Sequence, residues 1–116
     1  MVPDCDACPH ALVVDDDATL LQLGERRVDL RRRAPLRRLV RALVAARALR
    51  PGTAVSPDGL IAAAWPGERI QAKAARNRLH VAIASLRQMG LRAVLLSDDD
   101  GYLLAPSLDL AVRPAA

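Results

Sequence analysis

The amino-acid sequence predicts an α+β fold, with an antiparallel β-sheet first, three helices after it and a β-hairpin last. Three observations indicate this order. Short strand-like runs occupy residues 11–30, apolar residues recur at helical spacing three times between residues 35 and 89, and two more strand-like runs flank an acidic turn near residue 100. A chain of 116 residues corresponds to one domain, placed at residues 12–105. We expect a polar lead-in over residues 1–11 and a loosely ordered tail over residues 106–116.

The N-terminal sheet is expected to contain three short strands. They are Ala11–Val14, Leu20–Leu23 and Arg26–Leu30. Gly24-Glu25 provides the turn between the last two. The acids Asp15–Asp17 also resemble the opening of a phospho-receiver domain, but no later apolar strand ends in a phospho-accepting Asp. We therefore interpret them as a turn after the first strand.

The three helices are predicted from apolar spacing and from start and stop signals. The first begins at Pro35, carries Leu36, Leu39, Val40, Leu43 and Val44 on one side, and ends at Pro51-Gly52. Ser56-Pro57-Asp58 caps the second helix, which Trp65-Pro66-Gly67 closes. The third runs from about Gln71 to Met89 with Leu79, Ile83 and Leu86 on its buried side, and Gly90 is its C-terminal cap.

The chain after the third helix predicts a tight hairpin. Ala93–Leu96 and Tyr102–Leu104 are strand-like, and the acidic segment Ser97–Gly101 is the turn between them. A helix with a free outer face followed directly by a hairpin is the layout of a winged helix-turn-helix, in which the hairpin is the wing.

In this order and spacing, the elements resemble the DNA-binding effector domain of OmpR/PhoB-type response regulators, here without a receiver domain. The resemblance covers about residues 12–105. It is carried by the strand-loop-strand before the first helix and by Val55–Leu60, Ala64–Gly67, Val81–Arg87 and Gly101–Leu104. It implies a bacterial, cytoplasmic regulator of transcription whose third helix binds double-stranded DNA.

The side of the third helix opposite Leu86 provides the candidate DNA contacts. We expect Asn77, Arg78, Val81, Ser85 and Gln88 to lie nearest the bases, because amides and arginine read base edges and a small apolar side chain can meet a thymine methyl. Lys73, Arg76, Arg87 and some arginines of the first helix are expected at phosphates, and Arg92 is the cation at the base of the wing. The alternative reading is an ordinary solvent face.

Charge favours a nucleic-acid partner but also raises an objection. Residues 31–95 contain fourteen basic and two acidic side chains, whereas both ends of the chain are acidic. The wing turn Asp98–Asp100, however, would repel phosphate where similar wings carry cations. The runner-up function is therefore a protein-interaction module with little or no DNA binding. A homodimer is also open.

The remaining motifs predict neither a metal nor an enzyme. Cys5, Cys8 and His10 have metal-like spacing, but tetrahedral zinc needs a fourth ligand, for which only Asp4 or Asp6 is nearby, and no second Cys/His pair exists in the chain. We therefore expect no metal and no cofactor. No catalytic triad, paired carboxylates or phosphate loop is present, so neither an enzyme nor a small-molecule substrate is expected. No apolar run is long enough for a membrane span, and the polar start is unlike a signal peptide.

Overall fold

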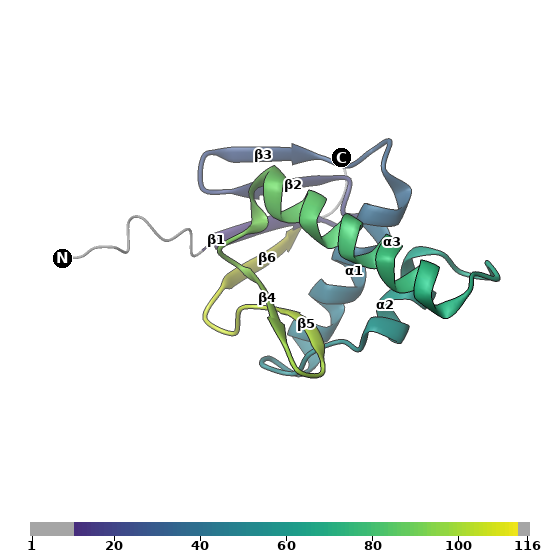
Figure 1. The fold of residues 1–116 in the computed structure, drawn as a ribbon. Helices are drawn as coiled ribbons and strands as arrows, with labels where there is room; N and C mark the ends of the chain where they lie inside the picture. The colour runs from purple at the N-terminus through teal and green to yellow at the C-terminus, as the bar shows by residue number, and fades with distance from the viewer. Residues whose placement is uncertain (1–10, 114–116) are drawn as a thin grey trace.

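The computed structural model describes residues 11–113. Within them, three α-helices and six β-strands in two sheets confirm the predicted α+β class (Figure 1). The strands are β1 (Ala11–Asp15), β2 (Leu20–Leu23), β3 (Arg26–Asp29), β4 (Leu95–Asp98), β5 (Gly101–Leu104) and β6 (Asp109–Arg113). The helices are α1 (Ala34–Leu49), α2 (Pro57–Ala64) and α3 (Ala72–Leu86), and a π-helical turn, η1 (Arg87–Leu91), follows α3.

The larger sheet has the strand order β3-β2-β1-β6. Its first three strands form the antiparallel meander that the sequence predicts. The turn between β1 and β2 is held by Asp15, whose carboxylate accepts hydrogen bonds from the backbone N–H of Thr19 (2.7 Å) and of Leu20 (3.3 Å) and from the Thr19 hydroxyl. The interpretation of the acids after the first strand as a turn is thus confirmed.

The fourth strand corrects the prediction of a loosely ordered tail. Residues 109–113 form β6, which pairs parallel to β1 with Leu12 opposite Leu110. The larger sheet is therefore mixed, and the folded domain extends beyond residue 105. The physical reason is a short period-two pattern: Leu108 is buried and Leu110 half-buried, whereas Asp109 and Ala111 are exposed, and the pattern ends at Val112, which is 51% exposed.

The helices follow their predicted signals closely. The Ser56 hydroxyl caps α2 by accepting a hydrogen bond from the Gly59 N–H at 3.0 Å. On α3, Leu79, Ile83 and Leu86 are buried as predicted. The regular part of α3 ends at Leu86 and not at Met89, because the chain widens into η1 before Gly90 adopts a φ of 138°, which favours glycine.

The smaller sheet is the hairpin of β4 and β5. It begins at Leu95 and not at Ala93, because Leu91–Val94 forms a turn in which the Val94 N–H donates to the Leu91 carbonyl (3.0 Å). Val55, between α1 and α2, bridges to Tyr102 through two backbone hydrogen bonds of 2.7 and 3.1 Å. This bridge fixes the hairpin to the helices.

One aliphatic core lies between the inner face of the larger sheet and the helices. Leu12, Leu21 and Val28 enter it from the sheet, and the three helices cover it from the other side. Trp65 is its only buried aromatic ring among the described residues. The core holds α3 by one side only, which leaves the other side of that helix to solvent.

Candidate nucleic-acid interface

The outer face of α3 is where the structure places most of the predicted contacts. Ala75, Leu79, Ala82, Ile83 and Leu86 face the core. The opposite side carries exposed Lys73, Asn77 and Val81, continues to exposed Gln88 in η1, and is bordered by exposed Arg78 and half-buried Ser85. The helix phase derived from the sequence therefore brings these residues to one surface, which we call the α3 face. Arg76 is also exposed, but it lies seven residues before Ile83, so it projects from the start of the helix on the side of the core.

Val81 gives the α3 face an apolar centre. Val81 is a large hydrophobic residue, yet it is 60% exposed to solvent. Asn77 and Ser85 lie one helical turn away on either side, so the valine is surrounded by hydrogen-bonding groups. Covering such an exposed apolar side chain with a partner surface lowers the free energy of the bound state, because apolar surface is removed from water.

Arg78 does not extend freely from the α3 face. Its guanidinium donates a hydrogen bond to the Glu68 carboxylate at 3.1 Å and lies 5.2 Å from the centre of the Trp65 ring. Both partners belong to the connection between α2 and α3, which the sequence did not associate with Arg78. This arginine is therefore oriented along the edge of the α3 face by its neighbours.

Arg87 has a different position from the one expected. Its Nε and Nη2 atoms donate to the Leu95 carbonyl at 3.1 and 2.9 Å, and its guanidinium lies 5.9 Å from the centre of the Tyr102 ring. These contacts join the end of α3 to the β4–β5 hairpin. Their effect is structural, and they direct Arg87 away from the phosphate contact that we expected.

Two arginines of α1 are likewise engaged within the protein. Arg38 donates to the Ala64 carbonyl at the end of α2 at 3.1 Å. Arg47 donates to the carbonyls of Ala105, Pro106 and Leu108 at 3.3, 2.9 and 2.6 Å. These bonds fix α2 and the connection between β5 and β6 to α1, so neither arginine is the free phosphate contact expected of the first helix.

Three of the cations predicted to contact DNA remain exposed without a strong partner among residues 11–113. Lys73 and Arg92 have no salt-bridge partner among residues 11–113. Arg76 lies 3.6 Å from Asp58, but this pair is strongly exposed and therefore weak. Lys73 and Arg76 stand at the start of α3, and Arg92 follows η1 at its other end.

One of the acids in the turn between β4 and β5 has a structural role. The Asp98 carboxylate accepts hydrogen bonds from the backbone N–H groups of Asp100 (2.8 Å) and Gly101 (3.1 Å). Asp99 and Asp100 are exposed. Turn geometry thus accounts for Asp98, whereas the charges of the other two acids remain on the surface.

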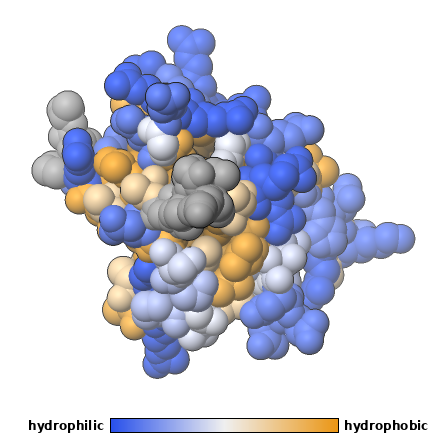
Figure 2. Space-filling view, turned by 90° about the vertical axis from the view of Figure 1, so that its left-hand side faces the viewer, coloured by the Kyte–Doolittle hydropathy of each residue, from blue (hydrophilic) through white to orange (hydrophobic). Residues whose placement is uncertain are grey.

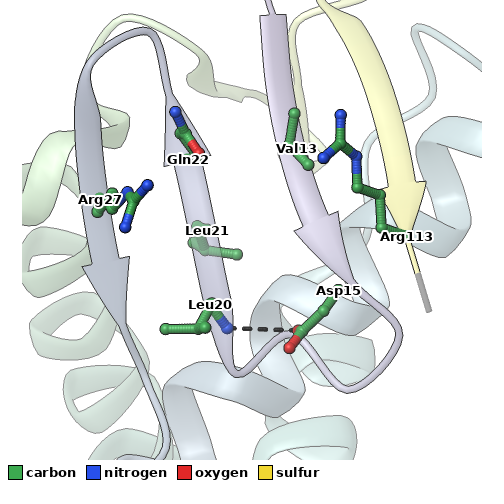
Figure 3. Close-up of a pocket in the computed structure, with 7 residues that line it drawn as sticks. All are labelled: Val13, Asp15, Leu20, Leu21, Gln22, Arg27 and Arg113. Carbon is green, nitrogen blue, oxygen red and sulfur yellow. Dashed lines mark hydrogen bonds between the residues drawn. The ribbon is translucent and has the colours of Figure 1, made fainter. Parts of the chain in front are cut away.

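A second feature is a shallow depression of about 330 Å³ on the outer face of the larger sheet (Figure 3). It is lined by Val13, Asp15, Leu20, Leu21, Gln22, Arg27 and Arg113. Partial burial by itself raises the pKa of Asp15, but the hydrogen bonds from Thr19 and Leu20 outweigh it and hold this pKa below its ordinary value. The carboxylate thus stays charged and serves the turn.

The side from which β1 begins has apolar residues across its middle and hydrophilic residues around them (Figure 2).

Among the described residues, no group of three or more His, Cys, Asp or Glu side chains is arranged to hold a metal, and Cys5, Cys8 and His10 lie outside these residues. No helix of this part has the length and apolarity that crossing a membrane requires.

Comparisons with protein-family models, curated proteins and solved structures gave no match for this chain. Function is therefore inferred from the α3 face and from the position of the hairpin next to it.

Proposed function

We propose that this chain binds double-stranded DNA through the α3 face and acts in the bacterial cytoplasm as a transcriptional regulator. The observation that carries the proposal is the division of α3 into a buried aliphatic side and an exposed side with amides, cations and Val81. The β4–β5 hairpin follows η1 in the chain, and in this proposal it serves as the wing of a winged helix.

The exposed side chains match the chemistry of a major groove. Asn77 and Gln88 can donate to and accept from adenine, and Val81 can contact the methyl group of thymine. Asn77 and Gln88, the two most distant of these residues, are eleven positions apart, which is about 16 Å along a helix axis. A helix lying in the groove presents a span of this length to successive base pairs. Lys73, Arg76 and Arg92 are available for phosphates at the two ends.

The contacts within the protein refine the set of residues. Arg78 is kept as a contact whose direction is set by Glu68 and Trp65. Ser85 is half-buried and borders the surface. Arg87 is left out of the phosphate contacts, because its guanidinium already binds the Leu95 carbonyl.

A second candidate function is a protein-interaction module, and the exposed acids Asp99 and Asp100 favour it. In that case Val81 would be covered by an apolar protein surface. The two candidates differ in salt dependence, because binding to DNA releases counterions and contact between apolar surfaces does not.

Fluorescence polarisation with a labelled duplex of random sequence tests the proposal. The affinity should fall with salt, with a slope of log K against log salt of about −0.9 for each phosphate neutralised. Lys73→Gln should reduce that slope by about one unit. Arg27→Gln is the matched control, because Arg27 lies on the outer face of the larger sheet. No binding at low salt would reject DNA as the partner.

A further inference from the structure

The two edges of the larger sheet differ in character. At one edge, β3 exposes the charged side chains of Arg26 and Arg27. At the other edge, β6 pairs with β1 on one side and, in the part of the chain that the structure describes, with no strand on the other (Figure 3). Charged residues discourage the pairing of an edge with another chain, whereas an apolar edge permits it.

The middle of β6 is Leu110-Ala111-Val112. Val112 is 51% exposed although it is opposite buried Val14 in the register with β1. Residues opposite each other share a face, so Leu110 and Val112 lie on the inner side of the sheet, and Ala111 lies on the outer side. The free edge of β6 therefore combines available backbone groups with apolar side chains.

The sequence of β6 is self-complementary in charge. It begins with Asp109 and ends with Arg113. If two copies of β6 pair antiparallel with Ala111 opposite Ala111, then Asp109 of each copy lies opposite Arg113 of the other. In the same register, Val112 lies opposite Leu110 of the second copy on the inner face, and the small side chain of alanine stands at the two-fold axis.

We propose that β6 is a homodimerisation edge, through which two copies of this chain join their larger sheets in the antiparallel register centred on Ala111. The interface is isologous and closed, because the same edge is used by both copies. It involves only five residues from each chain, which is small beside the roughly 800 Å² per partner of a standard interface. The dimer is therefore weak, and it forms in the absence of DNA.

Disulfide cross-linking tests the register. In a Cys5→Ser, Cys8→Ser background, Ala111→Cys should form a disulfide-linked dimer under mild oxidation, because residues opposite each other in an antiparallel pair have Cα atoms about 4.5–5.5 Å apart. Ala11→Cys is the matched control: it is exposed on the same face, but on β1, one strand further from the axis. Cross-linking of Ala111→Cys that does not exceed that of Ala11→Cys would overturn the proposal.

Charge exchange tests the self-complementarity. Sedimentation of the full chain under reducing conditions, from about 10 μM to about 1 mM, should show a shift from 12.5 kDa towards twice that mass. Asp109→Arg or Arg113→Asp alone should weaken association roughly tenfold, and the double variant should restore it. A monomer at every concentration, or a double variant that stays as weak as the single ones, would overturn the proposal. Because no DNA is present, either result leaves the DNA-binding proposal unaffected.

Discussion

The carboxylate of Glu68 lies 3.1 Å from the guanidinium of Arg78, and this pair joins the α2–α3 connection to the edge of the α3 face. The pair is half-exposed, so it contributes little to stability. Its effect on a bound polyanion is larger, because the carboxylate both orients the arginine and places a negative charge beside it. If the α3 face binds DNA as proposed, Glu68 is expected to moderate the contribution of Arg78.

Glu68→Gln should tighten DNA binding, most clearly at low salt, where charges are least screened. The free energy of unfolding should change by less than about 1 kcal/mol, because the pair is exposed. Polarisation titrations give the affinity for DNA, and urea denaturation gives the free energy of unfolding.

Arg78→Ala should weaken specific binding by about 1–3 kcal/mol, and in that background Glu68→Gln should have a much smaller effect. An equal gain in both backgrounds would show that Glu68 acts by its charge alone.

Leu86→Ala should lower the free energy of unfolding by roughly 2–5 kcal/mol, because Leu86 has no exposed surface and its truncation leaves a cavity in the core. Leu49→Ala is the same chemical change at a side chain that is 81% exposed, and it should cost well under 1 kcal/mol. Urea denaturation compares the two. Similar losses for both variants would contradict the assigned phase of α3.

Gly101→Ala should detach the hairpin from the helices. A Cβ atom at Gly101 would lie 2.0 Å from the Val55 carbonyl oxygen, and the φ of 147° is unfavourable for alanine. The expected cost exceeds about 2 kcal/mol. Gly67→Ala separates the steric clash from the unfavourable backbone conformation. Gly67 has a φ of 77° but open space around it, so this substitution should cost about 1–2 kcal/mol. Thermal melting measures both, and equal costs would remove the role assigned to the Val55–Tyr102 bridge.

If the α3 face binds DNA as proposed, neutralising the outer acids of the β4–β5 turn, with Asp99→Asn and Asp100→Asn together, should tighten binding to any duplex at low salt. Asn retains the turn propensity, and Asp98 still accepts the hydrogen bonds that close the turn. If the hairpin instead contacts a basic protein, DNA affinity should stay unchanged and that contact should be lost. A fall in DNA affinity would contradict both accounts.

The parts of the structure that depend on local signals could be predicted from the sequence. The phase of α3 follows from the spacing of Leu79, Ile83 and Leu86, and the start of α2 follows from Ser56-Pro57. These signals act within about two helical turns, so no knowledge of the tertiary fold is needed.

The parts that depend on distant segments could not be predicted in this way. The pairing of β6 with β1 joins the two ends of the domain, and its period-two pattern is short. The partners of Arg47 and Arg87 are backbone carbonyls, which every residue has, so no sequence pattern identifies them. The contact of Arg78 with Glu68 and Trp65 depends on the fold of the α2–α3 connection.

The most direct test of the central claim is a nuclear magnetic resonance titration of the ¹⁵N-labelled chain with a short duplex at low salt. The DNA-binding proposal predicts that the largest shifts of amide signals occur at Lys73, Asn77, Val81 and Gln88, with smaller shifts on the hairpin and none on the outer face of β2 and β3. Shifts confined to the larger sheet, or no shifts at a duplex concentration of about 1 mM, would contradict the proposal that α3 binds DNA.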